Sequence, residues 1–215
     1  MTVWVVVVAA GGGHRFGGRK QFAEIDGRPL VSWSVEAARS VADGIVLVVP
    51  ADIAGTDETH AYGADVVVAG GSTRTGSVRA GLVAVPGKAD VIVVHDGARP
   101  LASADLFRSV VDAVTSGAAA AVPGLALADT VKNVKDGVVV STLDRRGLVT
   151  VQTPQAFRAE VLRRALESGS DATDDAGLVE AQGATVRVVN GDPRNLKVTT
   201  PDDLEMVRAL IREFR

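Results

Sequence analysis

Four short runs of valine and isoleucine constrain the fold of this chain more than any other feature. They contain no charged residue, and they lie at positions 3–8, 45–49, 66–68 and 91–94. A strand that is apolar on both faces is typical of a parallel sheet covered by helices on each side. The sequence therefore predicts a buried parallel sheet at the centre of the fold.

Amphipathic stretches separate these runs and predict helices. Residues 29–41 begin with a proline, which favours a first helical position, and Ser103 is a predicted N-cap for residues 103–115. The same patterns predict helices at 76–85, 158–167, 174–182 and from 200 onward, and strands at 118–122 and 185–189. This alternation favours a Rossmann-like α/β fold, a mostly parallel sheet flanked by helices, whose ligands bind at the carboxyl ends of the strands.

The alternation breaks at about residues 127–152. Segments 130–134 and 138–143 flank Lys135-Asp136-Gly137, and an Asp-Gly pair is a strong hairpin signal. We interpret the insertion as a β-hairpin, which is either a surface feature or an arm that reaches a partner. Because no repeat or linker divides the sequence, we predict a single domain over residues 1–215.

Composition excludes several classes of protein. The 215 residues are 47% apolar and contain no cysteine, which excludes disorder, a disulfide scaffold and cysteine-based metal sites. A formal net charge of −3 disfavours nucleic-acid binding. No basic region precedes the apolar N-terminal run, and no run is long enough to span a membrane, so we expect a cytoplasmic protein. Since the sequence ends within the last predicted helix, we expect no second enzyme fused downstream.

The first predicted strand leads directly into a glycine-rich loop at residues 11–13. Glycines let backbone N–H groups approach an anion closely. The loop does not fit a dinucleotide fingerprint, because Phe16 stands where a glycine is needed. It also does not fit a P-loop, because Gly18 is followed by Arg19 and Lys20 instead of lysine and a hydroxyl residue.

Positive charge gathers in the same loop. Residues 11–20 contain Arg15, Arg19 and Lys20 and no acidic residue. Cations beside a glycine loop are suited to a triphosphate, whose transfer chemistry needs positive charge around phosphorus. We therefore predict that Arg15 and Lys20 face a nucleotide triphosphate; the alternative is a solvated basic loop.

Asp96 follows the apolar run at 91–94 and lies near Arg99. A carboxylate at the carboxyl end of a parallel strand is suited to hold Mg²⁺ against phosphate oxygens. We predict this metal role for Asp96, and the alternative is an aspartate that caps a turn. We interpret His95 as a packed or hydrogen-bonded structural residue, because no second histidine or cysteine lies at ligand spacing.

The glycine loop is one of several motifs that occur in the same order in a known family. The motifs are AAGGGHRFGGRKQF at 9–22, GGSTRTGSV at 70–78, VHDGARP at 94–100, DTVK at 129–132, DR at 144–145, QTPQ at 152–155, TDD at 173–175 and NLKVT at 195–199. Together they span nearly the whole chain. The chain resembles the 2-C-methyl-D-erythritol 4-phosphate cytidylyltransferases, nucleotidyltransferases of the non-mevalonate isoprenoid pathway.

This resemblance implies a reaction. CMP would pass from CTP to the phosphate of 2-C-methyl-D-erythritol 4-phosphate, giving 4-diphosphocytidyl-2-C-methyl-D-erythritol and pyrophosphate, with Mg²⁺ as the metal. An enzyme of the same chemistry that uses ribitol 5-phosphate is the nearest alternative. A nicotinamide-dependent oxidoreductase and a non-enzymatic nucleotide-binding regulator are more distant alternatives.

The resemblance also implies roles for individual residues. The implied catalytic residues are Arg15, Lys20 and Lys197. The implied CTP-binding residues are Ala9, Ala10, Gly11, Gly13, Gly71, Ser77 and Asp96. The implied ligands of the acceptor's phosphate are Arg99, Thr130, Arg145 and Thr173. Since Thr130 and Arg145 lie on the predicted hairpin, the resemblance implies an arm that crosses to a second copy, and hence a homodimer.

Overall fold

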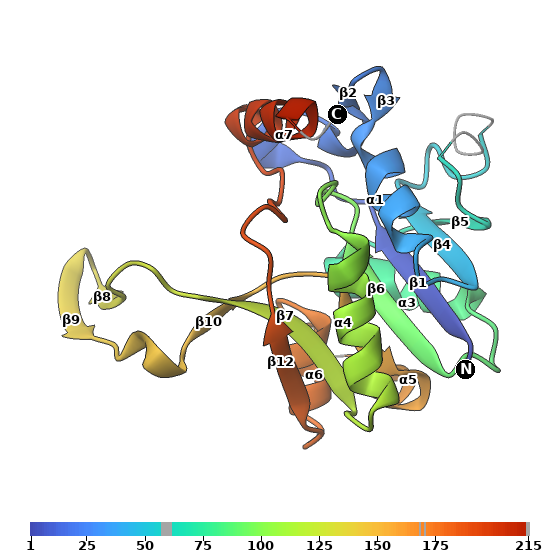
Figure 1. Ribbon diagram of the computed structural model, residues 1–215. Coiled ribbons are helices and arrows are strands. Elements are labelled where there is room, and N and C mark those ends of the chain that lie inside the picture. The colour runs from blue at the N-terminus through green and yellow to red at the C-terminus, as the bar shows by residue number, and fades with distance from the viewer. Residues whose placement is uncertain (57–61, 168, 170, 214–215) are drawn as a thin grey trace.

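An eight-stranded sheet forms the centre of the protein in a computed structural model that describes residues 1–56, 62–167, 169 and 171–213 (Figure 1). Seven strands follow the order β10-β7-β11-β6-β1-β4-β5, and β12 also pairs with β7. The strands are β1 (Val3–Val8), β4 (Gly44–Val49), β5 (Val66–Ala69), β6 (Val91–Asp96), β7 (Ala120–Ala126), β10 (Val149–Val151), β11 (Gln155–Arg158) and β12 (Val186–Asn190). The predicted mostly parallel sheet flanked by helices is confirmed.

The apolar runs form the parallel core of this sheet. Strand β1 pairs in parallel with β4 and with β6, so that Val5 lies between Ile45 and Val93. Every residue of β4 and β6 is buried. The two faces of the sheet pack in two separate apolar clusters, one containing Val5 and the other containing Val6. This two-sided burial is what the unbroken valine and isoleucine runs predict.

Helices cover both faces. Helices α1 (Leu30–Ala38) and α4 (Ala104–Thr115) contribute to the cluster that contains Val5. Helices α3 (Arg74–Ala84), α5 (Ala159–Glu167) and α6 (Asp175–Glu180) contribute to the opposite cluster. The predicted cap is confirmed, because Ser103 accepts a hydrogen bond from the backbone N–H of Leu106 at 3.1 Å.

The C-terminal helix closes a third, smaller cluster. Helix α7 (Pro201–Glu213) buries Leu204, Val207 and Ile211 against residues that include Leu30 and Val198. Among the described residues, no helix combines the length and the apolar character that crossing a membrane requires.

Two short elements differ from the prediction. An unpredicted hairpin of β2 (Glu24–Ile25) and β3 (Arg28–Pro29) precedes the first helix. Pro29, expected to open that helix, ends the hairpin, and the helix begins at Leu30. The sequence pattern does not predict strand β11, which lies between β6 and β7 and pairs with both in the antiparallel direction. Arg158, expected in a helix, therefore ends this strand, and α5 begins at the next residue.

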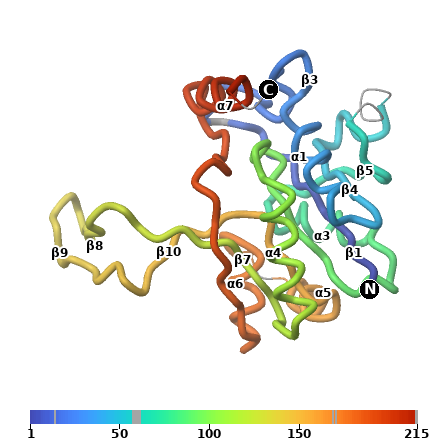
Figure 2. The backbone as a smooth tube through the Cα atoms, viewed as in Figure 1, coloured from blue at the N-terminus to red at the C-terminus, as the bar shows by residue number. Residues whose placement is uncertain are grey.

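The predicted hairpin is present as an arm that extends away from the body of the molecule (Figures 1 and 2). Strands β8 (Lys132–Lys135) and β9 (Val138–Thr142) form a separate two-stranded sheet. The turn between them places Asp136 and Gly137 at φ values of 50° and 80°, as an Asp-Gly hairpin requires. After a 3₁₀ turn at Arg145–Gly147, β10 returns to the main sheet. Whether the arm mediates dimerisation stays a prediction.

Candidate functional site

A cavity of about 400 Å³ opens at the carboxyl ends of β1 and β6, beside the start of α3. We call it the glycine-loop cleft. All ten residues predicted to bind CTP or to act in catalysis line it: Ala9, Ala10, Gly11, Gly13, Arg15, Lys20, Gly71, Ser77, Asp96 and Lys197. The structure thus brings together residues that are up to 188 positions apart in the chain, which is what a shared site requires; their chemical roles stay predictions.

Gly13 sets the path of the loop. Its φ of +68° lies in the left-handed region that favours glycine, and its carbonyl oxygen accepts hydrogen bonds from the backbone N–H groups of Phe16 and Gly17 at 2.9 and 3.1 Å. A Cβ at this position would overlap the carbonyl oxygen of Gly18. Only glycine therefore fits this turn without displacing the loop that carries Arg15.

Gln21 fixes the two ends of the loop to each other. Its buried side-chain amide donates hydrogen bonds to the carbonyl oxygens of Ala9 and Gly11, at 2.8 and 3.1 Å. Gln21 lies in a second 3₁₀ turn, Lys20–Phe22, and it lines the cleft. Sequence reasoning assigned it no role, although the Lys-Gln pair within the first motif was a usable signal.

Two of the three loop cations line the cleft. Arg15 and Lys20 do so, whereas Arg19 forms an ion pair with Asp52 at the surface, at 2.7 Å. The Lys20 ammonium donates a hydrogen bond to the carbonyl oxygen of Val198 at 2.5 Å. Burial, together with the nearby charge of Lys197, lowers the pKa of Lys20 below its ordinary value of 10.5. Cations that repel one another in this way are suited to an anionic ligand.

Asp96 supplies negative charge within this cationic cleft. Burial alone would raise its pKa, but the ammonium of Lys197, whose Nζ lies 2.6 Å from Oδ2, and the guanidinium of Arg74 hold the pKa of Asp96 well below its usual range. Its backbone N–H donates to Oγ1 of Thr153 at 3.0 Å, which fixes the end of β6. The carboxylate is therefore ionised at neutral pH.

This donor set fits Mg²⁺ only together with a ligand. Among the described residues, no group of three histidine, cysteine, aspartate or glutamate side chains is placed to hold a metal ion. Mg²⁺, however, commonly binds through one or two carboxylates and the phosphates of a substrate. A single ionised Asp96 in a cleft that cationic side chains line is compatible with that mode.

His95 lies behind Asp96 and is fully buried. Burial lowers the pKa of His95 to about 4, so the ring is neutral. Its Nδ1 lies 3.2 Å from Oγ1 of Thr153, its Nε2 lies 3.3 Å from the carbonyl oxygen of Arg99, and its ring packs against Phe107. These contacts confirm the structural interpretation of this histidine.

A second, smaller cavity of about 90 Å³ adjoins the first, and we call it the acceptor cavity. Of the four residues predicted to bind the acceptor's phosphate, Arg99 and Thr173 line it. The other two, Thr130 and Arg145, are exposed at the arm and line neither cavity. The structure therefore separates the predicted ligands into a pair in the body and a pair on the arm.

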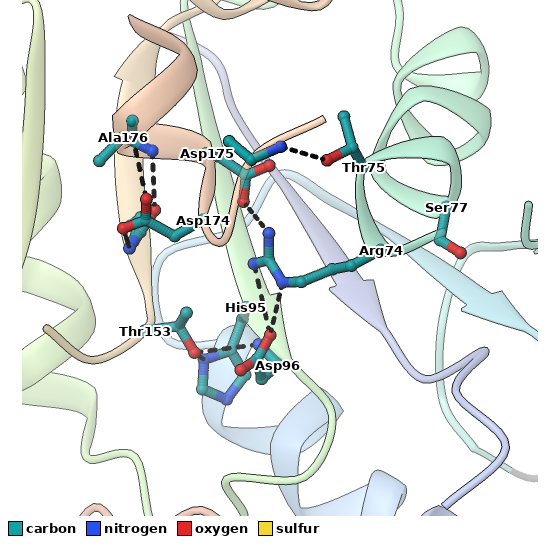
Figure 3. A network of polar contacts seen from close by, with 12 residues as sticks. Arg74, Thr75, Ser77, His95, Asp96, Thr153, Asp174, Asp175 and Ala176 are labelled. Carbon is teal, nitrogen blue, oxygen red and sulfur yellow. Dashed lines mark hydrogen bonds and ion pairs between the residues drawn. The ribbon is translucent and has the colours of Figure 1, made fainter. Parts of the chain in front are cut away.

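Arg74 is a charged residue of the site to which the sequence prediction assigned no role. Figure 3 shows its guanidinium between two carboxylates. Nη1 lies 2.8 Å from Oδ2 of Asp175, and Nε and Nη2 each lie 3.4 Å from Oδ1 of Asp96. Although burial opposes it, these two carboxylates raise the pKa of Arg74 above its ordinary value. A cation at the first residue of a helix opposes the helix dipole, and Arg74 lies within the motif at 70–78, so the sequence offered two signals for this residue.

An open α/β sheet with a glycine loop, cations and an ionised carboxylate at its carboxyl edge defines a nucleotide-binding α/β protein. Comparison with known proteins narrows this class. Residues 3–213 match the family described as 2-C-methyl-D-erythritol 4-phosphate cytidylyltransferase. The chain belongs to that family, as the motifs indicate.

Individual relatives agree with this assignment. A 2-C-methyl-D-erythritol 4-phosphate cytidylyltransferase from Rhodococcus jostii strain RHA1 is 43% identical over 217 residues, which cover 98% of this chain and 96% of the relative. A protein named bifunctional enzyme IspD/IspF, from Nitratidesulfovibrio vulgaris strain DP4, is 42% identical over 229 residues. That match covers 97% of this chain but only 58% of the relative, so the chain spans little more than half the length of the bifunctional relatives.

Solved structures show the same fold. The 2-C-methyl-D-erythritol 4-phosphate cytidylyltransferase of Thermus thermophilus superposes with a TM-score of 0.82 at 34% identity, covering 96% of this chain and 98% of that one. The 4-diphosphocytidyl-2C-methyl-D-erythritol synthase of Anaerococcus prevotii gives a TM-score of 0.85 at 29% identity, covering 98% of both chains.

Proposed function

We propose that this chain transfers CMP from CTP to the phosphate of 2-C-methyl-D-erythritol 4-phosphate, giving 4-diphosphocytidyl-2-C-methyl-D-erythritol and pyrophosphate. The observation that carries the proposal is the gathering of all ten predicted nucleotide and catalytic residues around the glycine-loop cleft. Membership of the cytidylyltransferase family supports it.

The proposed chemistry suits the charges of the site. A phosphate oxygen of the acceptor attacks the α-phosphorus of CTP, a new P–O bond forms, and the bond to pyrophosphate breaks. The nucleophile is already an anion, so the reaction needs no strong general base. Catalysis then consists of positioning the two substrates and neutralising the charge that develops on phosphorus. We propose that Arg15, Lys20 and Lys197 supply this positive charge, and their position on the lining of the cleft supports the proposal.

We further propose that Asp96 holds Mg²⁺ together with oxygens of the triphosphate. The bound ion would supply positive charge against the phosphates. The part played by the chain is to keep the Asp96 carboxylate ionised and fixed, which Lys197 and Arg74 support through their charges and the Thr153 hydroxyl through the backbone of β6.

We also propose a homodimer in which each arm completes the acceptor cavity of the other copy. Eight large apolar side chains are exposed on or beside the arm: Val134, Val138, Val139, Val140, Leu143, Leu148, Val149 and Val151. A patch of this kind marks an interaction surface. Thr130 and Arg145 lie outside the cavities of their own chain, which supports a role in the partner's site. Because the reaction consumes CTP, we propose that it takes place in the cytoplasm.

The direct test supplies the purified chain with CTP, Mg²⁺ and 2-C-methyl-D-erythritol 4-phosphate and measures pyrophosphate release and the nucleotide product. A parallel reaction with ribitol 5-phosphate tests the alternative acceptor. Arg15→Ala should abolish turnover, whereas Arg19→Ala, which removes a surface cation paired with Asp52, should retain it. A folded chain that releases no pyrophosphate with the methylerythritol acceptor would overturn the proposal.

A further inference from the structure

Arg74 lies at the boundary between the glycine-loop cleft and the acceptor cavity. It lines both, and so do Asp96 and Lys197. The proposed function already employs Asp96 and Lys197, but it gives Arg74 only the task of helping to keep Asp96 ionised. A guanidinium that is largely withdrawn from water needs partners that offset its loss of hydration, and the side chain of Arg74 is only 24% exposed.

The start of α3 is tied to the segment that carries Thr173. Thr73 donates from Oγ1 to Oδ1 of Asp171 at 3.0 Å, and Oγ1 of Thr75 accepts from the backbone N–H of Ala172 at 3.4 Å. Arg74 adds the ion pair with Asp175 at 2.8 Å. These contacts bracket Thr173 on both sides along the chain. They therefore join the helix that carries the predicted CTP ligand Ser77 to a predicted ligand of the acceptor's phosphate.

The same segment is fixed from its other side. Oδ2 of Asp174 accepts from Nε2 of Gln155 at 2.9 Å, and Oε1 of Gln155 accepts from the backbone N–H of Ala176 at 3.3 Å. Gln155 is buried at the start of β11. The segment around Thr173 is thus held between the central sheet and Arg74.

The two carboxylates hold Arg74 unequally. The contact with Asp175 is short and its carboxylate is fully buried, whereas the contacts with Asp96 are long, at 3.4 Å. The short contact of Asp96 is the one with Lys197, at 2.6 Å. If Lys197 turns to a phosphate, as the proposed function requires, Arg74 remains beside Asp96 because Asp175 holds it from the opposite side.

The burial of the Asp175 carboxylate is energetically unfavourable. Within the described ranges its Oδ1 is buried without a hydrogen-bond partner, and burial raises the pKa of Asp175 against the opposing charge of Arg74. A buried ion pair with an unsatisfied oxygen is weak support for stability. What the pair does supply is a fixed direction for the guanidinium of Arg74.

We propose that Arg74 is a positioning residue, held by Asp175, that fixes Asp96 relative to Thr173 across the boundary between the two cavities. The inference rests on the proposed function and deepens it. Arg74 sets the distance between the α-phosphorus of the nucleotide and the phosphate of the acceptor. Its loss misplaces the two reactants while each cavity still forms.

The test compares Arg74→Lys, Asp175→Asn and Asp175→Ala with the wild type. Lysine keeps the charge of Arg74 but cannot reach both carboxylates as a planar fork. Asparagine keeps the shape and one acceptor of Asp175, so it should retain more activity than alanine. Arg79→Lys is the matched control, because Arg79 lies on the same helix, contacts the carbonyl oxygen of Leu166 and lines neither cavity.

The expected result is a split between chemistry and nucleotide binding. In Arg74→Lys and Asp175→Ala, kcat should fall by about 10²-fold and the KM for the acceptor should rise, as for a misplacement of about 1 Å. The Kd for CTP, measured by calorimetry without acceptor, should stay close to that of Arg79→Lys. The melting temperature should also stay close to that of the control in Arg74→Lys, which keeps the charge. Asp175→Ala leaves the buried guanidinium without its short contact and should melt at a lower temperature, so its kcat is measured where this variant is folded. Because the two side chains act as a unit, the double variant Arg74→Lys/Asp175→Ala should be no worse than the poorer single variant.

Two outcomes would overturn the inference while the wild type is active. One is a kcat in Arg74→Lys and Asp175→Ala that matches Arg79→Lys. The other is a parallel loss of CTP affinity and melting temperature in Asp175→Asn, which indicates a structural role alone. A wild type that is folded but turns over neither acceptor refutes the proposed function itself, and the positioning role with it.

Discussion

Replacing Gly13 by alanine tests whether the shape of the glycine loop, beyond its charges, is needed for activity. The backbone at this position has a φ of +68°, which costs a residue with a Cβ about 1–2 kcal/mol. The added Cβ would also overlap the carbonyl oxygen of Gly18. Because this neighbour is backbone, a side-chain rotation cannot relieve the overlap, and the loop itself must move.

The expected loss of catalytic efficiency depends on the hydrogen bonds and cationic side chains of the loop that the substitution displaces. Movement weakens the hydrogen bonds that Gly13 accepts from Phe16 and Gly17, each worth about 1 kcal/mol, and displaces Arg15 and Lys20. A displacement of about 1 Å lowers catalytic efficiency by about 10²-fold. Gly13 belongs to none of the three apolar clusters, so the core should remain folded at the assay temperature, although the strain in the loop should lower the melting temperature by several degrees.

The assay is pyrophosphate release with CTP, Mg²⁺ and the methylerythritol acceptor, reported as kcat/KM for CTP. Gly18→Ala is the matched control, because a Cβ there meets no atom within 4 Å and its φ is not in the left-handed region. This control should stay within about threefold of the wild type, as an exposed substitution does. Equal activity in the two variants would refute the reasoning, and so would a fall in melting temperature that accounts for the lost activity.

Three further predictions concern the arm and two charged groups. Arg145→Ala should raise the KM for the acceptor. Mixing Arg145→Ala subunits with Lys20→Ala subunits should restore turnover, because one site of the mixed dimer combines the intact Lys20 of the first subunit with the intact arm of the second. Lys20 loses its proton as pH rises through its lowered pKa, so the alkaline decrease of kcat/KM should begin at a pH lower than 10.5. Lys20→Arg should move this alkaline decrease to higher pH. The pKa of Asp96 is depressed in the folded protein, so the ionised carboxylate stabilises the fold above the unfolded pKa of 3.8, and this stabilisation is lost as pH falls through the folded pKa. Asp96→Asn should therefore lower the free energy of unfolding by about 2 kcal/mol at neutral pH and by less in acid. Denaturant titrations at the two pH values measure this difference.

The central sheet could be predicted because its signal is local. The run at residues 3–8 coincides with β1, since six apolar residues in succession have no polar face to expose. The hairpin turn at Asp136 and Gly137 was equally clear, because its positive φ values favour these residue types. In both cases a few neighbouring residues contain the physical cause of the structure.

Strand β11 could not be predicted because its cause is not local. It has four residues, it begins with glutamine and ends with arginine, and its pattern is not that of a buried strand. It is buried because it inserts between β6 and β7. The β2–β3 hairpin was missed for a simpler reason, since two residues per strand are too few to show a period.

The residues of the site also separate into those whose position has a local cause in the sequence and those whose position does not. The glycine loop follows β1 and Asp96 is the last residue of β6, so their positions at the carboxyl edge were predictable from chain order. The pair of Arg74 and Asp175 joins residues 101 positions apart, and although each lies within a motif, nothing in the two motifs indicates that they contact each other. Fold-level reasoning thus locates the edge where chemistry occurs, but not the contacts that align two cavities along it.

The overall negative charge of the chain gives no indication of this cationic site, and it favours a small anionic ligand over a long polyanion. Of the described residues that line the glycine-loop cleft, four are cationic and one is a carboxylate, which gives a local charge of +3. Since the whole chain has a formal charge of −3, the remainder carries −6. A long polyanion that binds at the cleft also contacts the acidic surface around it and is repelled by that surface. A triphosphate is small enough to contact the cleft alone. Because charges beyond about 10 Å are largely screened at physiological salt, the local excess would govern the binding of the proposed triphosphate. The average charge and the local charge therefore act on different ligands: the first disfavours nucleic acid, and the second favours the proposed substrate CTP.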